Sequence, residues 1–110
     1  MNKQEYIRYC ASFPGALIDQ PFADDFDTFV ARHAHGRKWF ALIMEHEGRA
    51  MVNLKSDPAV SYMLRDAFEG VIPAYHMNKW HWNSVYLDSD VPEGVLREMT
   101  EASFALTMKK

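Results

Sequence analysis

Residues 38–55, KWFALIMEHEGRAMVNLK, decide the fold class of this chain. The first part, 38–45, is an almost continuous apolar run, which suits a central strand covered on both faces, although a buried helix segment would give the same pattern. Glu47 and Gly48 then form a tight-turn signal. In 49–55 every second side chain is apolar and falls on one face, a period of two that is typical of a strand. The stretch therefore predicts an antiparallel hairpin.

Segments on either side of this hairpin complete the predicted secondary structure. Three further strand-like runs are present: 28–33, 71–78 and 81–88. Three segments carry helical start and stop signals: 3–12, 56–70 and the segment that begins at Pro92. Because the strands lie between helices and are joined by tight turns, the order predicts one domain, 1–110, of α+β class with an antiparallel sheet.

The helix patterns also predict which side chains face the core. Cys10 lies on the apolar stripe of the first helix, and we interpret its thiol as a small buried hydrophobe rather than a nucleophile. The middle helix has an apolar stripe made of Val60, Met63, Leu64, Ala67 and Phe68. The last helix is predicted to turn inward Val95, Met99, Ala102, Ser103 and Leu106. Lys109 and Lys110 follow it, where positive charge favours the helix dipole.

Composition excludes several classes of protein. The 110 residues have an ordinary apolar content and suffice for one core, so a disordered chain is excluded. The net charge of −3 argues against a strongly basic nucleic-acid binder, and the single cysteine cannot form an intrachain disulfide. The start of the chain lacks the apolar core of a signal peptide, and no apolar run approaches the roughly 18 residues of a membrane span. We therefore expect a soluble cytoplasmic protein that does not enter membranes.

The charges are distributed unevenly along the chain. Residues 29–55 hold five basic and two acidic residues, and Lys79 is the only charged residue within 71–87. The acids gather outside these two hairpin regions, for instance at 24–27 and 88–101. Two interpretations stay open: a basic surface that forms when the chain folds, or an ordinary solvated surface of mixed sign.

The segment 75–82, YHMNKWHW, combines aromatic rings, two imidazoles, an amide and an ammonium group. Aromatic rings beside a cation can stack on nucleic-acid bases while the cation contacts phosphate, but the same rings can also pack in a core. If the segment forms strands, His76 and Asn78 share one face, and a turn near Lys79 and Trp80 presents the lysine at its tip.

No motif in the sequence predicts catalysis. Phosphate-binding loops, dinucleotide-binding fingerprints and serine-nucleophile motifs are all absent. The histidines, among them His33 and His35, lack the accompanying ligands of a known metal motif, and the acidic cluster at 24–27 is interpreted as a loop that caps and solvates itself. We expect no catalytic residue, no metal, no cofactor and no enzymatic activity.

Several segments together resemble the MmcQ/YjbR family. The specific match is the pattern His-x-Asn-Lys-x-x-Trp, which begins at His76 and ends at Trp82 and is followed by VYLD at 85–88. The weaker matches are RKWFAL at 37–42 for the family's Gly-Lys-x-Phe-Ala strand, VNLK at 52–55 for its Val-x-Leu-Lys segment, and ASF at 102–104 for its Ser-Tyr helix motif. Their order and spacing extend over nearly the whole chain.

The resemblance implies a frataxin-like (CyaY-like) α+β fold, with terminal helices packed on one face of an antiparallel sheet and a further helix inserted. It also implies a DNA-binding role through two hairpin wings, and few phosphate contacts would make that binding weak and non-specific. The matched positions are the implied nucleic-acid-binding residues: Lys38, Lys55, His76, Asn78, Lys79 and Trp82. Arg37 adds a basic group where the family has glycine. The iron chemistry of frataxin does not follow, because Glu5 is the only acid in the first helix.

The first functional hypothesis is a non-enzymatic DNA-binding module. A small-molecule or anion-binding module stays open if Lys55 converges in one polar pocket, edged by Trp82, with four residues of the segment 75–82: His76, Asn78, Lys79 and His81. A protein-interaction domain stays open if the basic aromatic face meets an acidic partner. Side chains that line one concave site would favour the small ligand. Side chains that spread along a convex face would favour nucleic acid.

Overall fold

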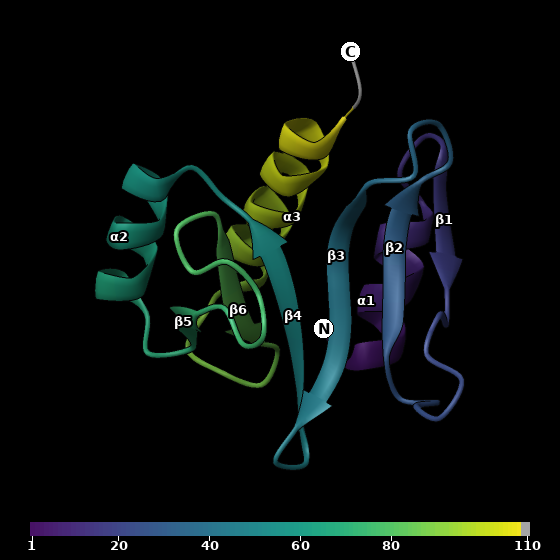
Figure 1. Ribbon diagram of the computed structural model, residues 1–110. Coiled ribbons are helices and arrows are strands. Elements are labelled where there is room, and N and C mark those ends of the chain that lie inside the picture. The colour runs from purple at the N-terminus through teal and green to yellow at the C-terminus, as the bar shows by residue number, and fades with distance from the viewer. Residues whose placement is uncertain (109–110) are drawn as a thin grey trace.

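The chain forms a six-stranded antiparallel sheet with three helices (Figure 1). The structure is a computed structural model that describes residues 1–108, so Lys109 and Lys110 lie outside it. In chain order the elements are α1 (Lys3–Ala11), β1 (Ala16–Asp19), β2 (Phe29–His33), β3 (Trp39–His46), β4 (Arg49–Lys55), α2 (Pro58–Ala67), β5 (Val71–Pro73), β6 (Trp82–Tyr86) and α3 (Glu93–Thr107). The strand order is β1-β2-β3-β4-β6-β5. The predicted α+β class is confirmed, and β1 is a strand that the pattern did not predict.

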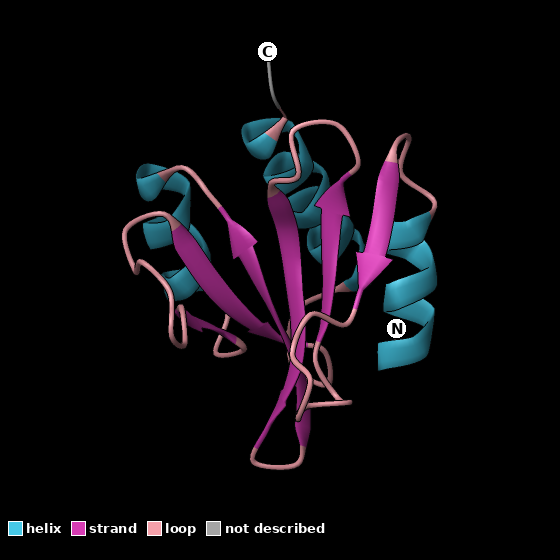
Figure 2. Ribbon diagram, turned by 45° about the vertical axis from the view of Figure 1, so that its right-hand side comes forward, coloured by secondary structure: helices cyan, strands magenta, loops and turns pink. Residues whose placement is uncertain are grey.

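The three helices lie on one face of the sheet (Figure 2). Between them and the strands is a core that includes Tyr6, Cys10, Phe40, Ile43, Leu54, Val85 and Leu96. The terminal helices α1 and α3 cover β1 to β4, and the inserted helix α2 contacts β5 at the edge of the sheet. The opposite face of the sheet has no helix among residues 1–108, and we call it the open face.

Helix α1 begins with a capping box and buries its thiol. The Asn2 side chain accepts a hydrogen bond from the Glu5 amide at 2.8 Å, and the Glu5 carboxylate accepts one from the Asn2 amide at 2.9 Å. Tyr6 and Cys10 of the same helix are fully buried. Burial raises the pKa of the Cys10 thiol to about 12, so it remains protonated at neutral pH. The interpretation of Cys10 as a buried hydrophobe is confirmed.

Three buried hydroxyl groups fix α3 to the rest of the fold. The Thr100 hydroxyl hydrogen-bonds to the Tyr6 hydroxyl of α1 at 2.7 Å, and Thr107 hydrogen-bonds to Nε2 of His33 in β2 at 2.8 Å. Between them, Ser103 contacts the backbone of both β3 and β4.

No helix within residues 1–108 combines the length and apolar character needed to cross a membrane.

The inward faces of α2 and α3 are displaced from the predicted ones. The buried residues of α3 are Leu96, Met99, Thr100, Ser103 and Thr107, whereas Ala102 and Leu106 are exposed and Val95 is half-buried. In α2 the residues turned inward are Ser61, Leu64 and Arg65, and Phe68 at its C-cap also packs on the core. Val60 and Met63 were predicted to face inward but are 47% and 71% exposed, and Ala67 is also exposed. The prediction was right for Leu64, Phe68, Val95, Met99 and Ser103. It was wrong for the five exposed positions, because polar side chains with buried hydrogen-bond partners occupy part of the inner stripe.

The second predicted hairpin is much shorter than expected, since 74–81 is a loop. The Tyr75 amide donates to the Ser84 hydroxyl at 2.8 Å, and the Tyr75 carbonyl accepts from the Asn53 side chain at 2.9 Å, so both backbone groups bond to side chains instead of a neighbouring strand. His76 has a φ of 62°, which is in the left-handed region. The prediction that His76 and Asn78 share a strand face was therefore wrong, and the loop lies over the open face.

Candidate nucleic-acid interface

Basic residues gather where β2 and β4 end and where β3 and β6 begin (Figure 1). The turn between β2 and β3 carries Arg37 and Lys38, and Lys55 at the end of β4 pairs in register with Trp82 of β6. Close to this edge, the Arg65 guanidinium donates to the Asn83 side chain, and the Lys79 ammonium donates to the Ala74 carbonyl. We call this region the basic end and define it by five residues: Arg37, Lys38, Lys55, Arg65 and Lys79.

Acidic residues gather at the opposite end of the same strands. They come from the β1–β2 loop, the β3–β4 turn and the segment after β6, and are Asp24, Asp25, Asp27, Glu45, Glu47, Asp88 and Asp90. We call this region the acidic end. Antiparallel pairing sorts the charges in this way because each hairpin returns the chain to the same edge of the sheet. A net charge of −3 therefore coexists with a basic surface.

The acidic cluster at 24–27 caps its own loop, as predicted. The Asp25 carboxylate accepts a hydrogen bond from the Thr28 hydroxyl and another from the Asp27 amide. These two bonds lower the pKa of Asp25 from its usual value. Within residues 1–108, no group of three or more His, Cys, Asp or Glu side chains is arranged to hold a metal ion.

Ion pairing distinguishes most of the other lysines and arginines from the basic end, although Arg8 also has no carboxylate oxygen within 4.0 Å in the part of the chain that the structure describes. Within residues 1–108, four lysine and arginine side chains form ion pairs with carboxylates, namely Lys3 with Glu45, Arg32 with Asp19, Arg49 with Asp88 and Arg97 with Glu93. Among the described residues, none of the five cations of the basic end has a carboxylate oxygen within 4.0 Å. Their charge is thus available to an anion from outside the chain.

The β2–β3 turn presents its two cations on a constrained backbone. Gly36 and Arg37 both have positive φ angles, 88° and 61°, and the His33 amide closes the turn on the Lys38 carbonyl at 2.9 Å. Glycine is the residue that adopts such an angle without a steric penalty. Arg37 therefore keeps a strained conformation and an exposed guanidinium at the position where the resemblance implies glycine.

Lys55 lies where β3 and β4 separate. The paired register of these strands ends at Ala41 and Leu54, and α3 fills the gap beyond it with Ser103. The Ser103 hydroxyl donates to the Phe40 carbonyl at 2.6 Å and accepts from the Lys55 amide at 2.9 Å. The half-buried Lys55 side chain lines a hollow of about 200 Å³ between α2 and α3. Ser103 thus fixes the position of Lys55 relative to β3.

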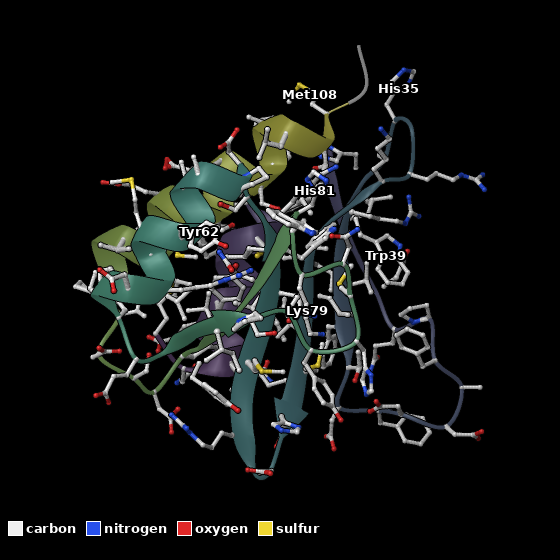
Figure 3. The ribbon with its side chains drawn as sticks, turned by 60° about the vertical axis from the view of Figure 1, so that its left-hand side comes forward. His35, Trp39, Tyr62, Lys79, His81 and Met108 are labelled. Atoms are coloured by element: carbon white, nitrogen blue, oxygen red, sulfur yellow. The ribbon has the colours of Figure 1, made fainter. Side chains whose placement is uncertain are left out.

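Lys79 is held by its own loop rather than extended from a tip. Its ammonium group donates to the Ala74 carbonyl at 2.9 Å, which closes the loop on itself. The Asn78 side-chain oxygen accepts from the amides of Trp80 and His81, so this residue shapes the turn. Lys79 was predicted at a hairpin tip, and that prediction was wrong because the loop folds back over the sheet (Figure 3).

The seven residues singled out from the sequence do not converge in one pocket. Lys79, Lys55 and His76 each line a different hollow. The hollow beside His76, about 470 Å³, lies on the open face among apolar side chains such as Trp39 and Met44. Trp82 is half-buried at the start of β6. Arg37, Lys38, Lys55 and Lys79 share the basic end, whereas His76 lies apart from them.

Arg65 is a residue of the basic end that the sequence analysis missed. Its guanidinium donates to the Asn83 side chain and to the carbonyls of Lys79 and Trp82, so it joins α2 to both ends of the loop turn. Tyr62 and Trp80 lie beside it around the same hollow. In the sequence, Arg65 follows Ser61 and Leu64 and precedes Phe68 at spacings that put all four residues on one helix face. This spacing is the signal that would identify Arg65 as facing inward.

His33 makes the stability of this end depend on pH. Burial lowers its pKa from the usual 6.5, so the unfolded chain binds the proton more readily than the folded one. The free energy of unfolding should therefore be highest above pH 6.5 and should fall as the pH drops from 6.5 toward the folded-state pKa. We expect a lower midpoint of urea unfolding at about pH 5 than at about pH 7.5, and a weaker difference in His33→Gln. His35→Gln, on the exposed part of the same turn, should show the same difference between the two urea midpoints as the wild type. If His33→Gln showed that full difference too, His33 would not be the source of the pH dependence.

Comparisons with known proteins identify the family and support the fold of this chain. The YjbR family model matches residues 11–106. The uncharacterized protein YbdF of Escherichia coli O157:H7 is 36% identical over 101 residues, which are 92% of this chain and 80% of that protein. The uncharacterized protein YyaQ of Bacillus subtilis (strain 168) is 31% identical over 117 aligned positions, covering 97% of this chain and 98% of that protein. A crystal structure of a Pseudomonas syringae protein superposes with a TM-score of 0.89 at 32% identity and covers 98% of this chain and 100% of that one. The chain therefore belongs to the YjbR family.

Proposed function

We propose that this protein is a non-enzymatic DNA-binding module that contacts phosphates through its basic end. The observation that carries the proposal is the set of five cations at one end of the sheet without a carboxylate partner among residues 1–108. Lysine and arginine side chains supply most of the affinity of proteins for the DNA backbone. The spread of Lys55 and Lys79 over separate hollows also suits an extended anion better than a small ligand.

The opposite polarity of the two ends supports the same proposal. A phosphate backbone would be attracted to the basic end and repelled by the carboxylates of the acidic end. This arrangement orients the molecule on DNA, although its net charge is −3. We assign the two hairpin wings that the family resemblance implies to the β2–β3 turn and to the loop 74–81.

We further infer that the fold is frataxin-like (CyaY-like) and that the protein acts in the cytoplasm. The packing of α1 and α3 on one face of an antiparallel sheet supports the fold assignment. The free thiol of Cys10 suits a reducing compartment. The frataxin-like fold does not bring iron chemistry with it, because Glu5 is the only acid of α1.

Salt dependence tests the proposal directly. With about four phosphate contacts, the logarithm of the association constant should fall by about 3.6 per decade of salt concentration. The affinity for a labelled duplex, measured by fluorescence anisotropy, should therefore drop roughly 150-fold between about 50 mM and about 200 mM salt. An affinity that does not change with salt would exclude phosphate contacts as its source, and the absence of duplex binding at low salt would overturn the proposal.

Reversing the charge of two lysines tests whether the basic end is the surface that contacts DNA. The double variant Lys38→Glu and Lys79→Glu should bind the duplex more weakly, and its salt slope should be smaller by about 1.8, because each lost contact removes about 0.9. Arg8→Glu is the control for charge, since Arg8 is exposed on α1 and is not one of the five residues of the basic end. The control changes the net charge by two and the double variant by four, so a loss of binding free energy in the control that is half that in the double variant would mean that only the total charge matters.

A further inference from the structure

A hollow between α2 and the loop 74–81 combines cations with aromatic rings. It has a volume of about 140 Å³ and is lined by Pro58, Ser61, Tyr62, Arg65, Lys79 and Trp80. Figure 3 shows Tyr62 and Lys79 on the same side of the molecule, one on the helix and the other on the loop.

The two cations of the hollow carry uncompensated charge. The Arg65 guanidinium donates only to neutral oxygens, those of Asn83, Lys79 and Trp82. The Lys79 ammonium likewise donates to a neutral oxygen, the Ala74 carbonyl. These bonds hold both head groups in place without neutralising them. An anion that enters the hollow would therefore meet two oriented positive charges and would not have to order flexible side chains first.

The two aromatic rings of the hollow are largely exposed. Tyr62 is 66% and Trp80 is 65% exposed, although both come from well-anchored backbone. Tyr62 belongs to α2, and the Trp80 amide is held by the Asn78 side chain at 2.9 Å. Large exposed rings on an ordered backbone, next to unpaired cations, are the combination with which proteins bind single-stranded nucleic acids.

We propose that this hollow binds single-stranded DNA, with one phosphate on Arg65 and Lys79 and an adjacent unpaired base stacked on Trp80 or Tyr62. The inference rests on the proposed DNA-binding function and adds the class of DNA. In a duplex both faces of each base are already stacked, so only an unpaired base offers a face to these rings. The other cations of the basic end, on the β2–β3 turn and β4, extend the contact along the backbone.

Aromatic truncation tests the stacking contact. The affinity for a labelled oligothymidylate of about 12 nucleotides should fall roughly 5- to 100-fold in Trp80→Ala or Tyr62→Ala, while the affinity for a duplex of the same length should change little. Both rings are exposed, so truncation is expected to leave the fold intact. Phe26→Ala is the matched control, because Phe26 is 79% exposed but lies at the acidic end. It should bind both DNAs like the wild type.

Two further measurements separate base stacking from phosphate contact. An oligonucleotide with the same phosphates but abasic positions should bind as weakly to the wild type as oligothymidylate binds to Trp80→Ala. Oligothymidylate should quench tryptophan emission, and Trp80→Phe should lose most of this quenching while it retains most of the affinity, because phenylalanine can still stack.

The outcomes distinguish this inference from the function on which it rests. If Trp80→Ala and Tyr62→Ala bind oligothymidylate like the wild type while Lys38→Glu with Lys79→Glu weakens duplex binding, the stacking site is wrong and the DNA-binding function stands. Equal affinity of the abasic and the normal oligonucleotide would also overturn the stacking site. If the wild type binds neither form of DNA at low salt, both proposals fall.

Discussion

Replacing Ser103 by alanine should lower the free energy of unfolding by about 2–4 kcal/mol, a large part of the 5–15 kcal/mol that stabilises a typical domain. The Ser103 hydroxyl is fully buried, donates to the Phe40 carbonyl at 2.6 Å and accepts from the Lys55 amide at 2.9 Å. Its loss leaves both backbone groups without a partner, at a cost of about 1–3 kcal/mol each. Because the paired register of β3 and β4 ends at Ala41 and Leu54, no neighbouring strand replaces these bonds. Urea unfolding followed by circular dichroism measures the difference.

A surface serine provides the control for this prediction. Ser12 also donates to a backbone carbonyl, that of Tyr9, at 2.6 Å, but it is exposed at the end of α1. Water can replace the bond there, so Ser12→Ala should change the free energy of unfolding by no more than about 0.5 kcal/mol. A similarly small effect of Ser103→Ala would mean that the two backbone groups find other partners, and that Ser103 does not hold the strands together.

The hairpin and the inner face of α1 could be predicted from the sequence, whereas the inner faces of α2 and α3 could be predicted only in part. The alternation in 49–55 and the turn at Glu47 and Gly48 identify β3 and β4 correctly, because a period of two depends only on local geometry. The inner stripe of α3 depends instead on Thr100, Ser103 and Thr107, whose buried hydroxyls have partners in α1, β2, β3 and β4. Apolar spacing alone selects the neighbouring stripe, since it does not reveal partners that are distant in the chain.

In the candidate site, too, local strand patterns could be predicted, whereas contacts between distant parts of the chain could not. Lys38 and Lys55 come to one edge because a hairpin returns the chain, so their proximity follows from the predicted strands. Arg65 was missed because its importance comes from bonds to Asn83 and to the loop carbonyls, which exist only after α2 has packed against the sheet. Residues 74–78 were predicted as part of a strand, and Lys79 and Trp80 as a turn. The backbone of 74–81 leaves the sheet because side chains of β4 and β6 offer it hydrogen bonds.

Replacing Asn53 by valine should detach this loop from the sheet and weaken both folding and DNA binding. Asn53 is fully buried in β4, where its amide group donates to the Tyr75 carbonyl and its oxygen accepts from the Ser84 hydroxyl, which in turn accepts from the Tyr75 amide. Valine suits the strand but cannot make these bonds, so we expect a loss of about 2–4 kcal/mol in the free energy of unfolding. Ordering even one loop residue again on binding costs about 1–2 kcal/mol, so the affinity for oligothymidylate should fall roughly tenfold or more, although Asn53 is not part of the hollow.

A double-mutant cycle and a second variant make this prediction specific. If Asn53 and Ser84 act through one network, the variant Asn53→Val with Ser84→Ala should be more stable than the sum of the single effects indicates, by about 1–2 kcal/mol. Thr100→Val loses a buried hydroxyl bonded to Tyr6, far from the loop, and should destabilise the fold without changing the affinity of the folded protein for oligothymidylate. Additive single effects, or equal losses of affinity in Asn53→Val and Thr100→Val, would mean that the loop is not held by this network. The network links the fold to the site: Asn53 and Ser84 place Tyr75, and Tyr75 begins the loop that carries Lys79 and Trp80.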